Sequence, residues 1–351
     1  MKLLQQTLAE IGDVDQKARA EAQKRLDSLT KPPGSLGVLE DIVLKLASIQ
    51  GRVIPVVDQK VVMIMAADHG VVEEGVSAFP QEVTVQMVQN FLHHGAAVNV
   101  LSKHAGARVV IADVGIKGEP ILHPDLKQRK VRPGTGNMSK EAAMCEAEAI
   151  AAIEAGIELV EQEINRGANL IATGEMGIGN TTASSAVLAA FCSCDLIEIT
   201  GRGTGIDDNG LKLKQAVIRK ALEINKPDAN LPLDVLHKVG GLEIAALTGV
   251  ILGAAARRVA VVVDGFISSV AALTAYKLAP LSVNYMLASH LSQEPGHRIA
   301  LNEMGLKPAL YLDLRLGEGT GAVLAFHMVE AAVRIISEMA TFEEAGVSNQ
   351  E

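Results

Sequence analysis

Hydrophobic residues along the chain fall into two patterns, short continuous runs and longer stretches with apolar positions three or four residues apart. The continuous runs predict buried strands at 61–67, 108–114, 170–173, 260–263 and 311–314. The wider spacing predicts helices at 81–105, 139–165, 183–191, 209–225, 240–257 and 267–278. Ser139 is the expected cap of the second of these helices. Strands alternating with helices in this way indicate an α/β fold with a parallel sheet flanked by helices.

The two ends of the chain are helical rather than alternating. Residues 1–30 carry apolar side chains at helical spacing and predict two helices or one broken helix, and residues 39–49 predict another. Between them, residues 31–37 read KPPGSLG, which cannot continue a helix. This segment is either a linker or a loop over a site. A last apolar helix is expected from residue 321 to about residue 339.

A glycine-rich segment follows the third predicted strand, where residues 174–182 read GEMGIGNTT. A strand, a glycine turn and a helix in succession aim backbone N–H groups at an anion. The spacing nearly matches a P-loop, but Asn180 stands where the lysine would be, so nothing reaches a β- or γ-phosphate. An ATPase or kinase is therefore rejected. The segment predicts a cradle for a single phosphate with Glu175 inside it, a purely structural turn being the alternative.

Three predicted strands end at a polar residue beside a glycine: 68–70 reads DHG, 173–175 reads TGE and 264–265 reads DG. Because the carboxyl ends of parallel strands share one sheet edge, these residues predict a single crevice with acceptors for hydroxyl groups, as a ribose would need. A second glycine-rich turn, 201–207, precedes a helix carrying Lys212 and Lys214. These lysines are candidate phosphate contacts or, alternatively, solvated helix residues.

Glu318 lies between two glycines at the start of an apolar helix. One interpretation is a charge placed favourably on the helix dipole, which would lower its pKa. The flanking glycines also let a ligand approach the backbone closely, and burial beside an apolar ligand would raise the pKa and make a better base. The sequence leaves both effects open.

Composition narrows the class of protein. The formal net charge is −9 over 351 residues, which disfavours a nucleic-acid-binding surface. Cys145, Cys192 and Cys194 have no spacing typical of a disulfide framework or a zinc site, and Asp68-His69 lacks a third metal ligand nearby. No signal peptide is recognisable, and the longest apolar stretch, 244–256, is shorter than the roughly 20 residues that span a bilayer. A cytoplasmic protein is expected, without contact to membrane.

Six motifs together resemble the nicotinate-nucleotide:dimethylbenzimidazole phosphoribosyltransferases of cobalamin assembly. The resemblance runs in order from about residue 20 to residue 345. The motifs are KPPGSLG at 31–37, ADHGV at 67–71, GEMGIGNTT at 174–182, KVGG at 238–241, DGF at 264–266 and RLGEGTG at 315–321.

The resemblance implies a reaction in which nicotinate mononucleotide and 5,6-dimethylbenzimidazole give α-ribazole 5′-phosphate and nicotinate. The leaving ring is already a pyridinium and departs as neutral-ring nicotinate without a general acid, so a single carboxylate base suffices, with neither metal nor cofactor. By resemblance Glu318 is that base, and attack opposite the leaving group inverts the anomeric carbon.

The resemblance also assigns binding residues in three groups. The phosphate group is Gly177, Asn180, Gly203 and Lys214, the ribose and nicotinate group is Glu175, Asp264, Gly265 and Ser292, and the base-pocket group is Phe79, Met87 and Leu316. Family members vary at the positions of Phe79 and Met87. An apolar wall there accepts dimethylbenzimidazole and leaves other benzimidazoles, purines and phenolics open as acceptors.

The family fold is similar to a Rossmann-like sheet with a smaller helical domain. This implies a small domain from residues 1–40 plus 295–351, a large nucleotide-binding domain at 41–294, and a homodimer. Two other functions stay open: a nucleotide N-glycosidase with water as acceptor, and a nucleotide-sensing module without catalysis. Glu318 separates them, because a sensor needs the cradle but no base.

Overall fold

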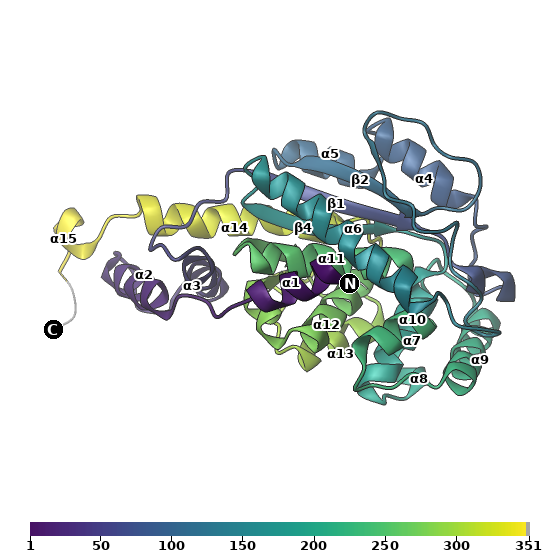
Figure 1. Ribbon diagram of the computed structural model, residues 1–351. Coiled ribbons are helices and arrows are strands. Elements are labelled where there is room, and N and C mark those ends of the chain that lie inside the picture. The colour runs from purple at the N-terminus through teal and green to yellow at the C-terminus, as the bar shows by residue number, and fades with distance from the viewer. Residues whose placement is uncertain (349–351) are drawn as a thin grey trace.

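The computed structural model describes residues 1–348, and a parallel sheet forms its centre (Figure 1). The order β3-β2-β1-β4-β5-β6 and the parallel pairing of all neighbours confirm the predicted Rossmann-like sheet. The strands are β1 (Lys60–Ala67), β2 (Arg108–Gly115), β3 (Leu126–Gln128), β4 (Leu170–Met176), β5 (Ala260–Val263) and β6 (Met286–Ala288).

Helices cover both faces of the sheet. Helices α4, α5 and α14 contact it on one side, and α11 and α12 on the other, with α6 packed against α11 (Figure 1). The helices are α1 (Lys2–Glu10), α2 (Gln16–Ser28), α3 (Val38–Gln50), η1 (Gly70–Glu74), α4 (Val83–Leu92), α5 (Ala97–His104), α6 (Glu146–Asn165), α7 (Asn180–Cys192), α8 (Leu196–Ile199), α9 (Asp208–Asn225), α10 (Pro232–Val239), α11 (Leu242–Ala256), α12 (Phe266–Leu278), η2 (Pro280–Tyr285), α13 (Pro295–Glu303), α14 (Thr320–Glu338) and α15 (Phe342–Ala345).

The strand order reverses between β1 and β4, which lie side by side at the centre. From β1 the chain proceeds outward to β2 and β3, and from β4 it proceeds the opposite way to β5 and β6. Connections that diverge in this way leave a crevice at the carboxyl ends of the strands, where open α/β sheets bind ligands. The polar residues after β1, β4 and β5 therefore lie at one edge of one sheet, as predicted.

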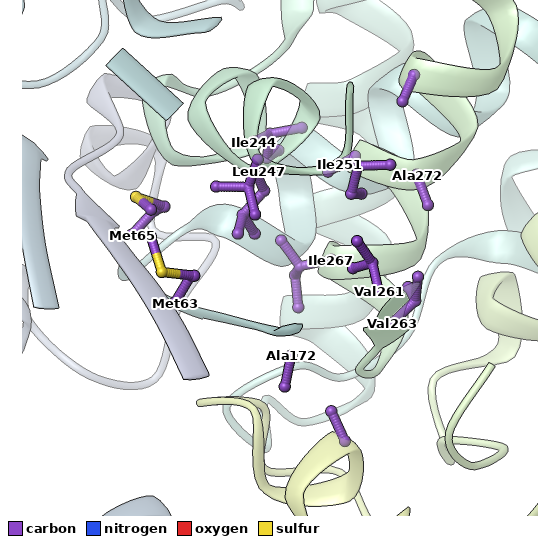
Figure 2. Packing of buried hydrophobic residues seen from close by; sticks show 14 of the residues in the cluster. Met63, Met65, Ala172, Ile244, Leu247, Ile251, Val261, Val263, Ile267 and Ala272 are labelled. Atoms are coloured by element: carbon purple, nitrogen blue, oxygen red, sulfur yellow. The ribbon is translucent and has the colours of Figure 1, made fainter. Parts of the chain in front are cut away.

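Buried strands and helix α11 form the core. All eight residues of β1 are buried, as expected for a central parallel strand covered on both faces. Figure 2 shows Ile244, Leu247 and Ile251 of α11 turned toward strand residues such as Met63 and Val261. The apolar runs therefore supply the layer between the sheet and its helices.

Helices α6 and α11 approach each other more closely than side chains would permit. A Cβ at Gly156 would collide with the carbonyl oxygen of Ala246, and one at Gly249 would collide with that of Ile153. On the next turn, a Cβ at Gly253 would lie 2.7 Å from Val160 Cγ1. Glycine is thus required on both helices for backbone-to-backbone contact.

Two of the predicted helices have different bounds in the structure. The stretch 81–105 is two helices, α4 and α5, because His94 has φ +60° and Gly95 follows, and Asn99 then accepts a hydrogen bond from the Ala96 N–H at the start of α5. The predicted cap at Ser139 is wrong. Ser139 is buried in a turn, and α6 starts only after Cys145, whose N–H donates to Glu148 Oε2 at 2.8 Å.

The strand predicted at 311–314 is also wrong. This segment is a loop, joined to the sheet only by a bridge between His290 and Leu310. The sixth strand is β6 instead. Strand β3 lies within residues 117–132, a polar stretch in which the sequence predicts no strand. Both missed strands are three residues long, too short for a periodic pattern.

Helix α14 is the one helix among residues 1–348 that is long and apolar enough to span a membrane by composition. It is the helix predicted from residue 321 to about residue 339, and His327, Glu330 and Arg334 interrupt its apolar sequence. Half of its most apolar window is buried, and it packs against β4, β5, α3 and α5. Its apolar side chains are accounted for by these contacts.

The two ends of the chain meet at one side of the molecule, where α2, α3 and the far half of α14 project from the main body (Figure 1). Arg25 Nε donates to the carbonyl of Ile336 at 2.7 Å, and Leu29 bridges to Thr341. Helix α1 instead packs against α6 and α11. The division at residues 40 and 295 stays a prediction.

Candidate active site

A cavity of about 690 Å³ opens at the carboxyl ends of β4, β5 and β6. It brings together ten of the twelve residues singled out from the sequence: Phe79, Met87, Glu175, Gly177, Asn180, Gly203, Gly265, Ser292, Leu316 and Glu318. Lys214 and Asp264 are not in its lining. The cavity also exposes residues that sequence analysis missed, among them Val83, Thr181, His290, Glu294 and Arg315.

The turn between β4 and α7 forms one side of the cavity. Gly179 is the N-cap of α7 and has φ +96°, a conformation that glycine adopts without strain. The turn lies directly on β1, since a Cβ at Gly177 would collide with the carbonyl oxygen of Ala67. The Ile178 N–H donates to Thr84 Oγ1 at 3.1 Å. The N-terminus of α7 is thereby held against the cavity, where its partial positive charge favours an anion.

Lys214 lies behind this anion site and not in it. Its side chain is buried, and Nζ donates to Thr181 Oγ1 at 2.9 Å and to the carbonyl of Gly201 at 3.1 Å. Burial lowers its pKa to about 8, and the negative charge of Glu294 opposes that effect. Lys214 therefore supports the wall made by Thr181 and the second glycine turn, and its positive charge acts on the cavity from behind.

Glu294 holds the same turn from the other side. Its Oε1 accepts a hydrogen bond from the Gly203 N–H at 3.0 Å, and its side chain is buried. Gly203 has φ +50°, and a Cβ there would collide with Thr181 Oγ1. Glu294 directly precedes α13 and belongs to no recognisable motif, so the sequence did not indicate its role at the cavity.

Glu318 lies in a strained turn at the cavity. It has φ +64°, between Gly317 at +83° and Gly319 at +94°. A residue other than glycine rarely adopts this left-handed conformation, which costs about 1–2 kcal/mol. The carboxylate is buried, and its Oε2 has no hydrogen-bond partner among the described residues 1–348. Burial raises its pKa to about 7, opposed by the Val98 N–H and reinforced by Asp264.

Asp264 fixes this turn from below. Its two carboxylate oxygens accept hydrogen bonds from the backbone N–H groups of Gly319 at 3.1 Å and Ala322 at 2.9 Å. Both donors belong to the first turn of α14 or its cap, so Asp264 caps that helix and orients Glu318. The ribose contact predicted for Asp264 stays a prediction.

Glu175 lies between the two turns. Its Oε2 accepts a hydrogen bond from Asn180 Nδ2, and the Glu318 N–H also donates to its carboxylate. Burial raises its pKa to about 8, and the charges of Asp264 and Glu243 raise it further.

The opposite wall of the cavity is apolar and open. Phe79, Val83 and Met87 line it, and Leu316 faces the same space. Phe79 and Leu316 are 52% and 58% exposed, so a flat apolar ligand would cover them. The segment 31–37 contributes nothing to the cavity lining, and neither does the pair Asp68-His69, which is buried beneath the glycine turn.

Within residues 1–348, no three side chains of His, Cys, Asp or Glu come together in an arrangement that could hold a metal ion. Cys145, Cys192 and Cys194 are free thiols, and burial raises the pKa of Cys192 to about 12. The acid–base groups available at the cavity are thus carboxylates and His290.

Known proteins are similar to this chain along almost its whole length. A family model described as Phosphoribosyltransferase matches residues 11–347. The nicotinate-nucleotide–dimethylbenzimidazole phosphoribosyltransferase of Desulforamulus reducens is 58% identical over 349 residues, covering 99% of both chains. The enzyme of the same name from Chloroflexus aggregans is 55% identical over 350 residues, covering 100% of this chain and 99% of the relative.

A solved structure shares the fold. The crystal structure of CobT from Thermus thermophilus has a TM-score of 0.92 at 48% sequence identity, covering 95% of this chain and 100% of that one. Full-length identity above one half, the matching family model and the fold agree with the six motifs. The chain belongs to the nicotinate-nucleotide–dimethylbenzimidazole phosphoribosyltransferase family.

Proposed function

We propose that the protein transfers the phosphoribosyl group of nicotinate mononucleotide to 5,6-dimethylbenzimidazole, a step in assembling the lower ligand of cobalamin. The observation that carries the proposal is Glu318, a buried carboxylate whose Oε2 has no hydrogen-bond partner in the described chain and whose pKa of about 7 suits a general base. The anion site at α7 and the apolar wall at Phe79 lie around the same cavity. The names of the relatives support the same reaction.

The chemistry needs one bond to break and one to form. A benzimidazole nitrogen attacks C1′ of the ribose while the bond from C1′ to the pyridinium nitrogen breaks. The bonding pair neutralises the pyridinium, so nicotinate leaves without a proton. The N–H proton of the attacking base passes to Glu318. Because attack and departure occur on opposite faces, the β-nucleotide gives the α-ribotide.

The cavity offers a separate place for each part of the substrates. The phosphate would lie at the turn of Gly177 and Asn180 and beside Gly203, with Lys214 contributing charge from behind. Ribose and nicotinate would lie between Glu175 and the residues Gly265 and Ser292. The acceptor base would lie against Phe79, Met87 and Leu316. These apolar side chains would select a base by its shape and not by polar contacts, so related bases would also be accepted.

A product assay tests this proposal. Purified protein without added metal is mixed with nicotinate mononucleotide and dimethylbenzimidazole, and nicotinate and ribotide are followed by chromatography and mass. Equal amounts of both, with no nicotinate when the benzimidazole is omitted, are expected. Nicotinate without ribotide would identify a nucleotide hydrolase instead. Binding without any product would favour a sensor.

We also propose that the protein acts in the cytoplasm as a homodimer, and that residues 1–40 and 295–351 form a separate small domain. The family resemblance supports the dimer, and the contacts between α2 and α14 support the small domain. Light scattering in solution should give twice the chain mass of 36.9 kDa. A monomeric mass would refute the dimer.

A further inference from the structure

A buried pair of oppositely charged side chains lies under the active-site floor. His69 follows β1 and Glu243 lies in the first turn of α11, and neither is more than 1% exposed. His69 Nε2 lies 2.8 Å from Glu243 Oε1. Neither residue lines the cavity, so the reaction proposed above leaves both unexplained.

The pair touches the parts of the floor that must keep their positions. A Cβ at Gly177 would lie 3.4 Å from His69 Nε2, and one at Gly179 would lie 3.1 Å from His69 Cβ. The carbonyl of His69 also accepts a hydrogen bond from Gln81 Nε2 at 3.2 Å, just before the apolar wall of α4 begins. His69 is thus one of the residues on which the glycine turn rests, together with Ala67 and Val72.

The two side chains also compensate each other electrostatically. For His69, burial opposes the protonated form, but Glu243 and Asp68 outweigh burial and raise the pKa of the imidazole. Glu243 Oε1 contacts His69, and Glu243 Oε2 has no hydrogen-bond partner within residues 1–348. Each side chain is therefore held in place by the other.

We propose that His69 and Glu243 are positioning residues: His69 supports the glycine turn that binds the nucleotide, and Glu243 holds the imidazole through its contact with Nε2. This inference rests on the proposed function only for its effect on nucleotide binding. The effect on the glycine turn concerns the free protein and is measured without ligand.

The support is tested without ligand by hydrogen exchange in the glycine turn, where the Ile178 N–H donates to Thr84 Oγ1. This amide should exchange about 10-fold faster or more in His69→Ala than in the unsubstituted protein, because the turn opens more often. Glu243→Gln keeps a hydrogen bond to the imidazole and should exchange almost normally. Glu163→Gln removes an equally buried carboxylate, paired with Arg108 and Arg166, and is the control.

That control should leave the exchange of the Ile178 amide unchanged, because Arg108 begins β2 at the amino edge of the sheet, the edge opposite the cavity. Equal exchange in His69→Ala and in the Glu163→Gln control would overturn the supporting role.

The support is tested by calorimetric binding of nicotinate mononucleotide at pH 6, where Glu175 is mostly protonated. His69→Ala removes the surface under the turn and should weaken binding about 10-fold or more. His69→Gln should recover part of that loss, and Glu243→Gln should bind almost normally. Full affinity in His69→Ala would overturn the supporting role. If His69→Ala does not fold, the comparison of His69→Gln with Glu243→Gln decides the same question. Absence of binding by the unsubstituted protein would instead count against the proposed function, and hydrogen exchange would still decide the inference.

Discussion

Two turns of the same sequence pattern line the cavity and do different things. The first reads Gly177-Ile178-Gly179 before α7, and the second reads Gly317-Glu318-Gly319 before α14. Each ends in a glycine N-cap with nearly the same φ, +96° at Gly179 and +94° at Gly319. The two turns therefore use the same backbone conformation to expose the N-terminus of the helix that follows.

The middle residue makes the difference. Ile178 has ordinary backbone angles and is buried, so the first turn presents only main-chain groups. In the second turn all three residues have positive φ, and the strained middle residue is a carboxylate. One turn is suited to hold an anion and the other to accept a proton. A motif of the form G-x-G at a helix start thus identifies a site, and its central residue indicates the chemistry.

The largest effect that would sharpen this contrast is expected from Glu318→Gln. Removing the base should lower kcat by about 10²–10⁴-fold, the usual contribution of general-base catalysis, while nucleotide binding at the first turn persists. Steady-state kinetics and calorimetry measure the two quantities. Glu338→Gln, an exposed change at the other end of α14, is the control and should behave as the unsubstituted protein. Unchanged turnover in Glu318→Gln would remove the distinction between the turns.

The pH dependence should separate the turns next. Since Glu318 must lose its proton to act, turnover should rise with pH through about 7. Its folded pKa is raised above the ordinary 4.5, so the folded protein binds more protons than the unfolded chain between those values. The unfolding free energy should therefore decrease as pH rises through this window, by up to about 3 kcal/mol from this group. Denaturant unfolding at several pH values should show a weaker decrease in Glu318→Gln; an equal decrease would contradict the assignment.

The smallest effect concerns the first turn alone. Gly179→Ala would force an alanine to φ +96° and place its Cβ 2.7 Å from Val72 Cγ2. Gly167→Ala is a matched control, with φ +99° and no atom within 4 Å of its Cβ. Both should lose about 1–2 kcal/mol of stability to backbone strain, and Gly179→Ala a further 1–2 kcal/mol, roughly, to overpacking. Only Gly179→Ala should also weaken nucleotide binding. Equal stability losses in the two variants would show that the turn does not rest on η1.

Sequence reasoning located both turns because strand, glycine and helix follow one another locally. It placed Lys214 in the phosphate site, since helical spacing shows that the lysine follows a glycine turn but not which way it points. The pair His69 and Glu243 was invisible, because these residues are 174 positions apart. The false strand at 311–314 arose from an apolar run whose residues serve the cavity instead, where Leu314 and Leu316 lie.

The contact between α6 and α11 has a consequence for how the sequence can vary. Where two helices meet through Gly156, Gly249 and Gly253, no side-chain layer exists that could absorb a change of volume. Elsewhere in the core a swap such as Ile to Val costs only about 0.5–1.5 kcal/mol, so sequences can drift there. In a saturation library, these three glycines should not be replaceable even by alanine, while the surrounding aliphatic residues should exchange with one another freely. Glu243 lies in the first turn of α11, the helix that this glycine contact holds in place. Natural variation can therefore shift the floor of the active site very little.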